Sequence, residues 1–364
     1  MIFISFPFLK KQLFKIILLL LLLIIFVFVK NKDIFVKIII DYIFNNKLYN
    51  SPFLKSKFNN SFFFEENQEE LNYCNHYGLF VYDYYYENKI KFANIGDYIQ
   101  SLAALQYLPK NCKPYLIDRD HIQFYHGPKV KLIMNGWFIL HKGNIEISEQ
   151  IDPIFVSYHL FNDKQLPSDY LKSIKKFTPI GCRDKNTRDT LIKLGINAYF
   201  SSCLTTTLDL DYFSSGDKRT NEIIFIDYKF GDYPKADKFL YSLSAYNFNN
   251  ITHTNHLFNI SMTHLERFKL AKSLLDKYSK AKLVVSTRIH GALPCLSFQT
   301  PVIFVNKKYD YKRYNGIYDL LNTIGINIEN KFKIRININE KGLVYNSNEY
   351  IKYSKELKMK LGRI

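Results

Sequence analysis

"STRIHGALPCLSF" (Ser286–Phe298) follows the apolar run "AKLVV" and leads into a second run, "PVIFV". The β-branched residues of the two runs predict buried strands, and the small and apolar residues 291–298 predict a helix between them. A strand, a helix and a further strand in this order are typical of a parallel α/β sheet. The turn before the helix carries Arg288 and His290, and a helix start has N–H groups without intrahelical partners. The sequence therefore predicts an anion-binding turn made by Arg288, His290 and the helix start at Gly291.

The same alternation of apolar runs and helical patterns extends over most of the chain. Before residue 210, strands are predicted at 78–84, 114–118, 130–134, 154–158, 178–182 and 198–202, with helices at 97–107, 167–176 and 187–194. After a charged link, strands are predicted at 222–228, 250–253, 282–286 and 302–305, with helices at 264–279, 291–298 and 316–324. The pattern predicts an α/β fold of two Rossmann-like domains, residues 73–210 and 211–364, that face each other across a cleft.

The N-terminus has a different composition. Residues Leu13–Val29 are apolar except for Lys15, and these seventeen residues would form a helix about 26 Å long, at the short end of a membrane span. No small-residue cleavage site follows, so we expect an uncleaved single-pass anchor within residues 1–32. Residues 33–72 are then expected to form an interfacial segment and a stem. Lysines on both flanks leave open which side of the membrane carries the folded body.

Charge and cysteine content limit the partners. The 364 residues carry a formal net charge of +17, which favours an acidic partner such as an anionic membrane surface or a phosphorylated substrate. We expect no nucleic-acid partner, because the scattered lysines accompany no zinc pattern, aromatic RNA-binding motif or basic helix. The five cysteines are odd in number and widely spaced, so neither a disulfide framework nor a metal site is expected.

Two further turns resemble the one at Arg288. In "ANIGDYIQSLAALQYLP" (93–109), Gly96 would let the backbone approach a ligand, and Asp97 lies at the N-cap or in the first turn of the next helix. In "PIGCRDKNT" (179–187), Arg183 and Asp184 end a buried strand. Such a pair can clamp an anion and accept a proton, or it can form an ion pair that fixes the loop.

Histidines elsewhere are weaker candidates. His159 follows the apolar run "IFVSY", and His256 lies in the segment "THTNH" near another predicted strand end. Each could contact a sugar or a phosphate, and each could equally be a polar loop residue. The sequence alone favours the loop interpretation for both.

Several of these segments, taken in order, resemble the polysaccharide pyruvyl transferase family. They are "NIGDYIQSLAALQYLP", "IDRD", "NGWF", "PIGCRD", "YFSSCLTTTL" and "STRIHGALPCLSFQTPVIFV", and the resemblance spans roughly residues 73–310. It implies a fold similar to the two-domain architecture of GT-B glycosyltransferases. It also implies transfer of the enolpyruvate carbons of phosphoenolpyruvate to two hydroxyls of a sugar, which forms a ketal.

This chemistry suggests roles for the residues of the three turns. The carboxylate and phosphate of the donor require fixed cations and N–H donors, which Arg288, Arg183 and the helix start at Gly291 could supply. Asn94 and Gly96 are expected to contact substrate.

The reaction that the resemblance implies also needs an acid and a base. His290, with an ordinary pKa of about 6.5, is the candidate for general acid or phosphate partner. Asp97 is the first candidate for the base that activates the acceptor hydroxyl, and Asp184 is the second.

The expected partners are phosphoenolpyruvate, a sugar or polysaccharide acceptor that includes lipid-linked forms, and the membrane. No cofactor is expected, because phosphoenolpyruvate is a donor substrate. Two alternatives stay open at this point. One is a membrane-anchored GT-B glycosyltransferase that uses a nucleotide sugar, although no GxGxxG motif occurs. The other is a catalytically inactive relative that binds glycans.

Overall fold

The computed structural model describes residues 73–83, 91–110, 113–138, 147–160, 168–213, 219–248, 251–306, 311–326 and 331–362. All of them belong to one structural unit. The expected membrane anchor (1–32) and the interfacial segment and stem (33–72) lie outside the described residues. Within the described ranges, no helix is both long enough and apolar enough to cross a membrane.

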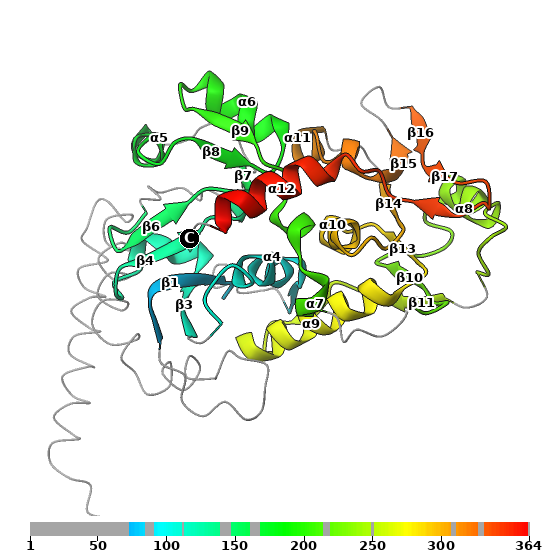
Figure 1. The fold of residues 1–364 in the computed structure, drawn as a ribbon, viewed down its shortest axis with the longest axis horizontal. Coiled ribbons are helices and arrows are strands. Elements are labelled where there is room, and N and C mark those ends of the chain that lie inside the picture. Colours follow the sequence, from blue (N-terminus) through cyan, green and yellow to red (C-terminus); the bar gives the residue numbers. More distant parts are fainter. Residues whose placement is uncertain are drawn as a thin grey trace, which may run out of the picture. The chain divides into compact units, whose positions relative to one another are not determined.

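The first half of the described chain contains two parallel four-stranded sheets (Figure 1). One has the order β3-β1-β4-β6, with β1 (Tyr73–Val81), β3 (Lys113–Asp118), β4 (Val130–Ile133) and β6 (Ile151–Ile154). The other has the order β5-β7-β8-β9, with β5 (Gly136–Phe138), β7 (Tyr158–Leu160), β8 (Ile180–Cys182) and β9 (Ala198–Phe200). The helices of the first half are α4 (Gly96–Leu105), α5 (Ser168–Lys175) and α6 (Lys185–Lys193). Every residue of β7 and β8 is buried, as expected for parallel strands covered on both faces.

The second half forms one six-stranded sheet of order β11-β10-β13-β14-β15-β16, in which only the last pair is antiparallel among the described strands. The strands are β10 (Ile223–Ile226), β11 (Ile251–Thr254), β13 (Leu283–Ser286), β14 (Val302–Asn306), β15 (Asn322–Ile326) and β16 (Phe332–Arg335). The helices are α8 (Pro234–Tyr241), α9 (His264–Lys280), α10 (Ile289–Ser297), α11 (Tyr311–Tyr314) and α12 (Tyr350–Leu361). The runs "IIFI" and "LVVS" are fully buried in β10 and β13, which is why they lack alternation.

Short elements complete the described chain. They are β2 (Phe92–Asn94), β12 (Leu257–Asn259), β17 (Asn337–Ile338), β18 (Val344–Tyr345), η2 (Arg119–Phe124), η3 (Leu204–Thr207), η4 (Tyr318–Leu320) and α7 (Leu210–Phe213). The predicted domain boundary between residues 210 and 211 falls inside α7.

The predicted α/β class with parallel sheets is confirmed, and two predicted elements are wrong. The strand expected at 154–158 does not form, because the chain leaves β6 at Ile154 and Ser157 takes a positive φ of 54° before β7 begins. The helix expected at 316–324 is instead η4 followed by β15. Strand β15 pairs in parallel with β14, so sheet pairing decided a segment whose local pattern resembled a helix.

Specific contacts join the two halves. Strand β2 of the first half pairs antiparallel with β12 of the second, and the Ile95 N–H donates to the His256 carbonyl at 2.7 Å. On α9, Arg267 donates from Nη1 to the Tyr82 carbonyl at 2.7 Å, and from Nη2 to the Ile260 carbonyl at 2.5 Å. Arg267 Nη1 also donates to the Tyr98 hydroxyl of α4 at 2.8 Å, so the start of α4 is fixed against the second half, to which Ile260 itself belongs.

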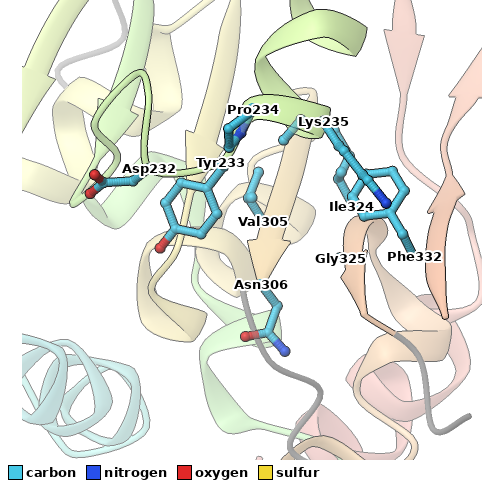
Figure 2. A pocket seen from close by; sticks show the side chains of 10 residues that line it. Asp232, Tyr233, Pro234, Lys235, Val305, Asn306, Ile324, Gly325 and Phe332 are labelled. Carbon is cyan, nitrogen blue, oxygen red and sulfur yellow. The ribbon is translucent and has the colours of Figure 1, made fainter. Parts of the chain in front are cut away.

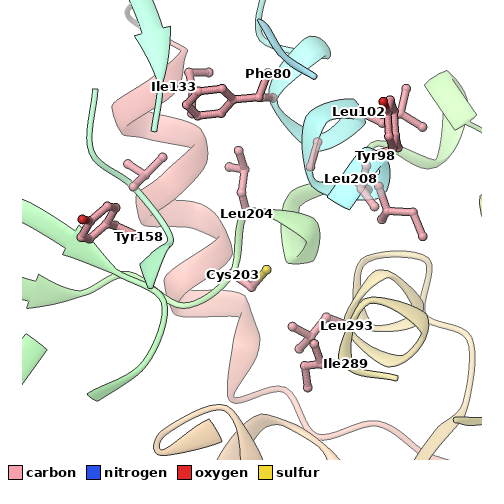
Figure 3. Packing of buried hydrophobic residues seen from close by; sticks show 14 of the residues in the cluster. Phe80, Tyr98, Leu102, Ile133, Tyr158, Cys203, Leu204, Leu208, Ile289 and Leu293 are labelled. Atoms are coloured by element: carbon pink, nitrogen blue, oxygen red, sulfur yellow. The ribbon is translucent and has the colours of Figure 1, made fainter. Parts of the chain in front are cut away.

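The largest hydrophobic cluster also belongs to both halves. Figure 3 shows Leu204 and Leu208 of the η3 region between Leu102 of α4 and Leu293 of α10. Helix α12 returns from the end of the chain to the same region, where Ser354 Oγ donates to the Thr206 carbonyl at 3.0 Å. Helices α4, α10 and α12 therefore all pack against η3, so helices of both halves share one tightly packed region of the core.

Candidate functional site

The turn at Arg288 has the predicted place in the fold, but its helix begins earlier than expected. Arg288 is the N-cap of α10, and its N–H donates to Ser286 Oγ at 3.0 Å. The helix starts at Ile289 rather than at Gly291, and the Gly291 N–H already bonds the Arg288 carbonyl at 3.0 Å. A β-carbon at Gly291 would lie only 2.6 Å from Ser286 Oγ. Gly291 therefore allows α10 to pack against β13, and its N–H is used within the helix rather than held for a substrate.

His290 is buried at this helix start, with 5% of its surface exposed. Its Nε2 has no hydrogen-bond partner among the residues that the structure describes. Burial is the largest cause that holds the pKa of His290 well below its ordinary value, and the positive charges of Arg183 and Arg313 lower it further. The ring is therefore neutral at pH 7, and its Nε2 is available to a bound group.

Arg183 provides a buried positive charge close to His290. It follows β8, only 2% of its surface is exposed, and its Nη2 has no hydrogen-bond partner within the described ranges. Burial lowers the pKa of Arg183, and Arg313 on α11 lowers it further, whereas Asp184 opposes the shift. Two arginines thus lie within electrostatic range of the same buried histidine. Sequence analysis did not identify Arg313, because it comes from a four-residue helix outside every motif.

A histidine and an aspartate form a hydrogen-bonded pair next to Arg183. His159, at the centre of β7, donates from Nδ1 to Asp184 Oδ2 at 2.6 Å, and its Nε2 has no partner in the described part of the chain. Burial lowers the pKa of His159 to about 4, with Arg183 as the second cause, so the ring is neutral. His159 is therefore not the polar loop residue that the sequence favoured.

Asp184 is fully buried and has a second task. It is the N-cap of α6, where Oδ1 accepts the Thr187 N–H at 2.8 Å and Oδ2 accepts the Thr187 hydroxyl at 2.9 Å. Both of its oxygens are thus used within the fold. The geometry thus favours a positioning role for Asp184, and the residue that it orients is His159.

Arg288 lies on the other side of the turn. Its Nε donates to Asp227 Oδ2 at 2.5 Å, and 38% of its side chain is exposed. Asp227 directly follows β10 and also accepts the His256 N–H at 3.2 Å. The cations that act most strongly on His290 are Arg183 and Arg313, whereas Arg288 is among the charges that act on His256.

His256 is fully buried and neutral. Its Nε2 lies 2.9 Å from the Tyr278 hydroxyl, and burial lowers its pKa to about 4. Its backbone links Asp227 to the β2–β12 connection between the halves. His256 lies in the bend between β11 and β12, as the loop interpretation expected, but it is buried and its role here is structural.

Asp97 lies in the first turn of α4, next to Gly96, whose backbone lies against His290. The N-cap is Ile95, so Asp97 does not cap the helix. Its Oδ1 accepts from Gln100 Nε2 at 3.3 Å, and its Oδ2 lies 4.0 Å from Nη1 of the buried Arg119. Two residues before it, Asn94 Oδ1 accepts the Gly96 N–H at 3.0 Å. Asn94 and Gly96 therefore shape the turn that presents Asp97.

The arrangement suits an anionic ligand. Buried polar atoms almost always have partners, yet Arg183 Nη2, His159 Nε2 and His290 Nε2 have none among the described residues. A phosphate or carboxylate would satisfy the guanidinium, whereas the Nε2 lone pair of the neutral His159 ring would accept a hydrogen bond from a substrate hydroxyl. In the described residues, no group of three or more His, Cys, Asp or Glu side chains could hold a metal ion.

In parallel α/β sheets, ligand sites lie outside the carboxyl ends of the strands, which is where Arg183 follows β8 and Arg288 precedes α10. The family model for polysaccharide pyruvyl transferase matches residues 94–309. The chain therefore belongs to the polysaccharide pyruvyl transferase family and is a transferase, as the motifs indicated.

The chain is similar to the crystal structure of a functionally uncharacterized protein from Klebsiella pneumoniae, with 16% identity, a TM-score of 0.41, and coverage of 76% of this chain and 96% of the other. Among curated proteins, none matches the sequence significantly.

Proposed function

We propose that the protein transfers the enolpyruvate group of phosphoenolpyruvate to two hydroxyls of one sugar in a polysaccharide or its precursor. The observation that carries this proposal is the buried Arg183 guanidinium, whose Nη2 has no partner in the described chain and whose positive charge lowers the pKa of two neutral histidines, His159 and His290. A fully buried cation without a hydrogen-bonded counter-ion is costly unless a ligand supplies one.

The donor carries two anionic groups, and the turn offers two places for them. Arg183 and Arg313 would bind one group beside His290. The first N–H groups of α10 and the Arg288 guanidinium would bind the other, because Asp227 takes the Arg288 Nε and leaves the terminal nitrogens for a substrate. The proposal includes a GT-B-like arrangement, in which the donor lies in a cleft between the two halves.

The reaction can be written with balanced protons. The methylene carbon of phosphoenolpyruvate gains one proton and becomes a methyl group, so that positive charge develops at C2. Two C–O bonds then form from C2 to the sugar oxygens, and the C2–O bond to phosphate breaks. One hydroxyl proton replaces the proton given to the methylene, and the other leaves with the phosphate. The site must therefore supply one acid and accept two hydroxyl protons in turn.

His290 is the proposed acid. In the free protein it is neutral, because Arg183 and Arg313 add to the effect of burial on its pKa. The bound donor neutralises these cations and brings negative charge, so its arrival raises the pKa of His290 and allows the ring to take up a proton. The acid is thus charged only when its substrate is present.

Two groups can accept the hydroxyl protons. Asp97 directly follows Gly96, and the backbone of Gly96 lies against the His290 ring. The side chain of Asp97 is 13% exposed, so a substrate hydroxyl can reach its carboxylate. His159 has a neutral ring whose Nδ1–H is fixed by Asp184, so the lone pair of Nε2 is presented for a proton. We assign the first hydroxyl to Asp97 and the second transfer, toward the departing phosphate, to His159.

The test uses the full-length protein in detergent, carbon-labelled phosphoenolpyruvate and a library of glycans and lipid-linked sugars. We expect label in one glycan class together with an equal amount of released phosphate. Calorimetric titration of phosphoenolpyruvate without an acceptor should show binding. If no phosphoenolpyruvate binds to folded protein but sugar from a nucleotide sugar is transferred, the chain is a glycosyltransferase of similar fold. Binding of glycans without either reaction would indicate an inactive relative.

The membrane assignment is a separate proposal. We propose that Leu13–Val29 anchors the protein and that the acceptor is lipid-linked, because seventeen mainly apolar residues match a short membrane span. Phosphoenolpyruvate is a cytosolic metabolite, which favours a cytosolic active site. Carbonate extraction of membranes, with a variant lacking residues 1–32 as the comparison, tests the anchor. Recovery of the full-length protein in the soluble fraction would overturn it.

A further inference from the structure

A pocket of about 390 Å³ opens in the second half, at the ends of β14 and β15 (Figure 2). Its volume is within the range of small-molecule sites. The described residues around it supply an apolar floor from Val305 and Ile324, and two aromatic rings, Tyr233 and Phe332, on opposite sides. Its polar groups are Asp232, Lys235 and Asn306. The donor chemistry proposed above uses none of these side chains.

The pocket lies beside the Arg288 side of the donor turn. Tyr233 forms one of its walls and stacks on Tyr228, with ring centroids 5.1 Å apart. Burial raises the pKa of the Tyr233 hydroxyl, and Asp232, Arg288 and Asp227 are the charges that act on it. Arg288 and Asp227 form the ion pair that follows β10. A ligand that lies against Tyr233 would thus lie next to the Arg288 side of the donor turn, within the second half.

The charge of the pocket favours a neutral ligand. The nearest helix start, that of α8, begins with Pro234, which has no N–H group to offer. Asp237 in the first turn accepts the Gly231 N–H at 2.9 Å and the Tyr228 hydroxyl, so a carboxylate of the chain already occupies this positive helix end. Lys235 lies over the Phe332 ring at 5.2 Å, and Figure 2 shows the Asp232 carboxylate on the opposite side, beyond Tyr233, so the lining carries one charge of each sign. The helix start and the charges of this pocket therefore do not suit a diphosphate.

We propose that this pocket binds a hexopyranose ring of the acceptor, with the apolar face of the ring on Tyr233 and its hydroxyls toward Asn306 and Lys235. Aromatic faces combined with a few polar groups suit a ring that has apolar C–H faces and polar edges. The inference rests on the proposed function, because it takes the acceptor to be a sugar. It adds that the second half binds the acceptor next to Arg288, while Asp97 of the first half accepts the proton of its hydroxyl.

Saturation-transfer NMR titrations of the full-length protein would test the site. The probes are the methyl pyranosides of glucose, galactose and mannose, with uridine monophosphate as the comparison, each with and without saturating phosphoenolpyruvate. The variants are Tyr233→Ala and Tyr233→Phe. Tyr241→Ala is the matched control, because this tyrosine ends the helix that Tyr233 caps, is 63% exposed and is outside the pocket lining.

We expect at least one glycoside to bind, with a Kd that rises tenfold or more in Tyr233→Ala and changes less than twofold in Tyr233→Phe and Tyr241→Ala. The Kd of phosphoenolpyruvate should stay within twofold in all three variants, which also shows that they are folded. Glycoside binding unaffected by Tyr233→Ala, the absence of any glycoside binding, or displacement of the sugar by uridine monophosphate would each overturn the assignment. If glycosides bind through Tyr233 while phosphoenolpyruvate does not bind, the proposed function fails and the sugar site stands.

Discussion

The backbone of Gly96 lies directly against the ring of His290. A β-carbon built on Gly96 would be 2.9 Å from Nδ1 and 3.1 Å from Cβ of the histidine. Sequence analysis expected this glycine to let the backbone approach a ligand, whereas the structure shows an approach to the proposed acid itself. Because β2 and β12 pair just before Gly96, the contact holds a side chain of the second half against a helix start of the first.

Replacing Gly96 with alanine should therefore displace His290 without unfolding the protein. Alanine is favoured over glycine in a helix by about 1 kcal/mol, which offsets part of the steric cost. We expect kcat to fall at least tenfold, with a change in melting temperature of a few degrees and a Kd for phosphoenolpyruvate within a few-fold of wild type. Steady-state kinetics and thermal denaturation check this. Wild-type kcat in Gly96→Ala would show that the position of His290 does not limit the reaction.

Arg183→Lys should remove donor binding although it retains a positive charge. Lysine cannot reproduce the planar guanidinium donors, and a buried ammonium group tends to lose its proton. We expect the Kd of phosphoenolpyruvate to rise at least a hundredfold, which corresponds to about 3 kcal/mol.

The matched control for Arg183 is Arg188→Lys, on the following helix, where the arginine is partly exposed and pairs with Asp189 at 2.7 Å. It should bind phosphoenolpyruvate as the wild type does. Equal effects of the two substitutions in calorimetric titrations would argue that net charge, rather than the buried guanidinium, attracts the donor.

Asp184→Asn separates the two tasks of this aspartate. Asparagine is as good an N-cap as aspartate, so α6 should keep its first turn and stability should change by less than about 1 kcal/mol. The amide cannot hold the His159 Nδ1–H as a carboxylate does, so we expect kcat to fall tenfold to a hundredfold with little change in the KM for phosphoenolpyruvate.

Asp184→Ala is the comparison, because it removes the cap as well and should lower both stability and kcat. Nitrogen NMR of the His159 ring would report the change of tautomer directly. If Asp184→Asn keeps full activity, the pair with His159 has only a structural role.

The sequence predicted the fold where a local pattern and the sheet agree. The runs before and after "STRIHGALPCLSF" became β13 and β14, because β-branched residues suit strands buried on both faces. It failed where a contact distant in sequence decided the structure. The apolar run around Ile154 divides between two sheets, and the segment after Gly316 becomes β15 because it pairs with β14.

The same distinction applies to the site. Arg183, His290 and Asp97 were predictable, because strand-to-helix turns in parallel sheets converge at one edge. The importance of His159 depends on a bond to Asp184 twenty-five residues later, and Arg313 comes from a short helix without any motif. Neither contact leaves a periodic signal in the sequence.

The buried neutral histidines should make the fold sensitive to acid. The pKa values of His159 and His256 are about 4 in the folded protein, against 6.5 for an ordinary histidine. Between these values the unfolded chain binds more protons than the folded one, so stability is fully present above pH 6.5 and is lost as the pH falls toward 4. The difference corresponds to about 3 kcal/mol for each histidine.

His256→Gln should weaken the dependence of stability on pH. Glutamine places an amide near the position of Nε2 and can keep the bond to the Tyr278 hydroxyl, but it does not titrate. Thermal denaturation of the full-length protein in one detergent, from pH 7.5 to 4.5, should show a smaller loss of melting temperature in this variant than in the wild type. His126→Gln, a change at an exposed histidine, is the control and should follow the wild-type curve. Parallel curves for all three proteins would mean that other groups control the acid sensitivity.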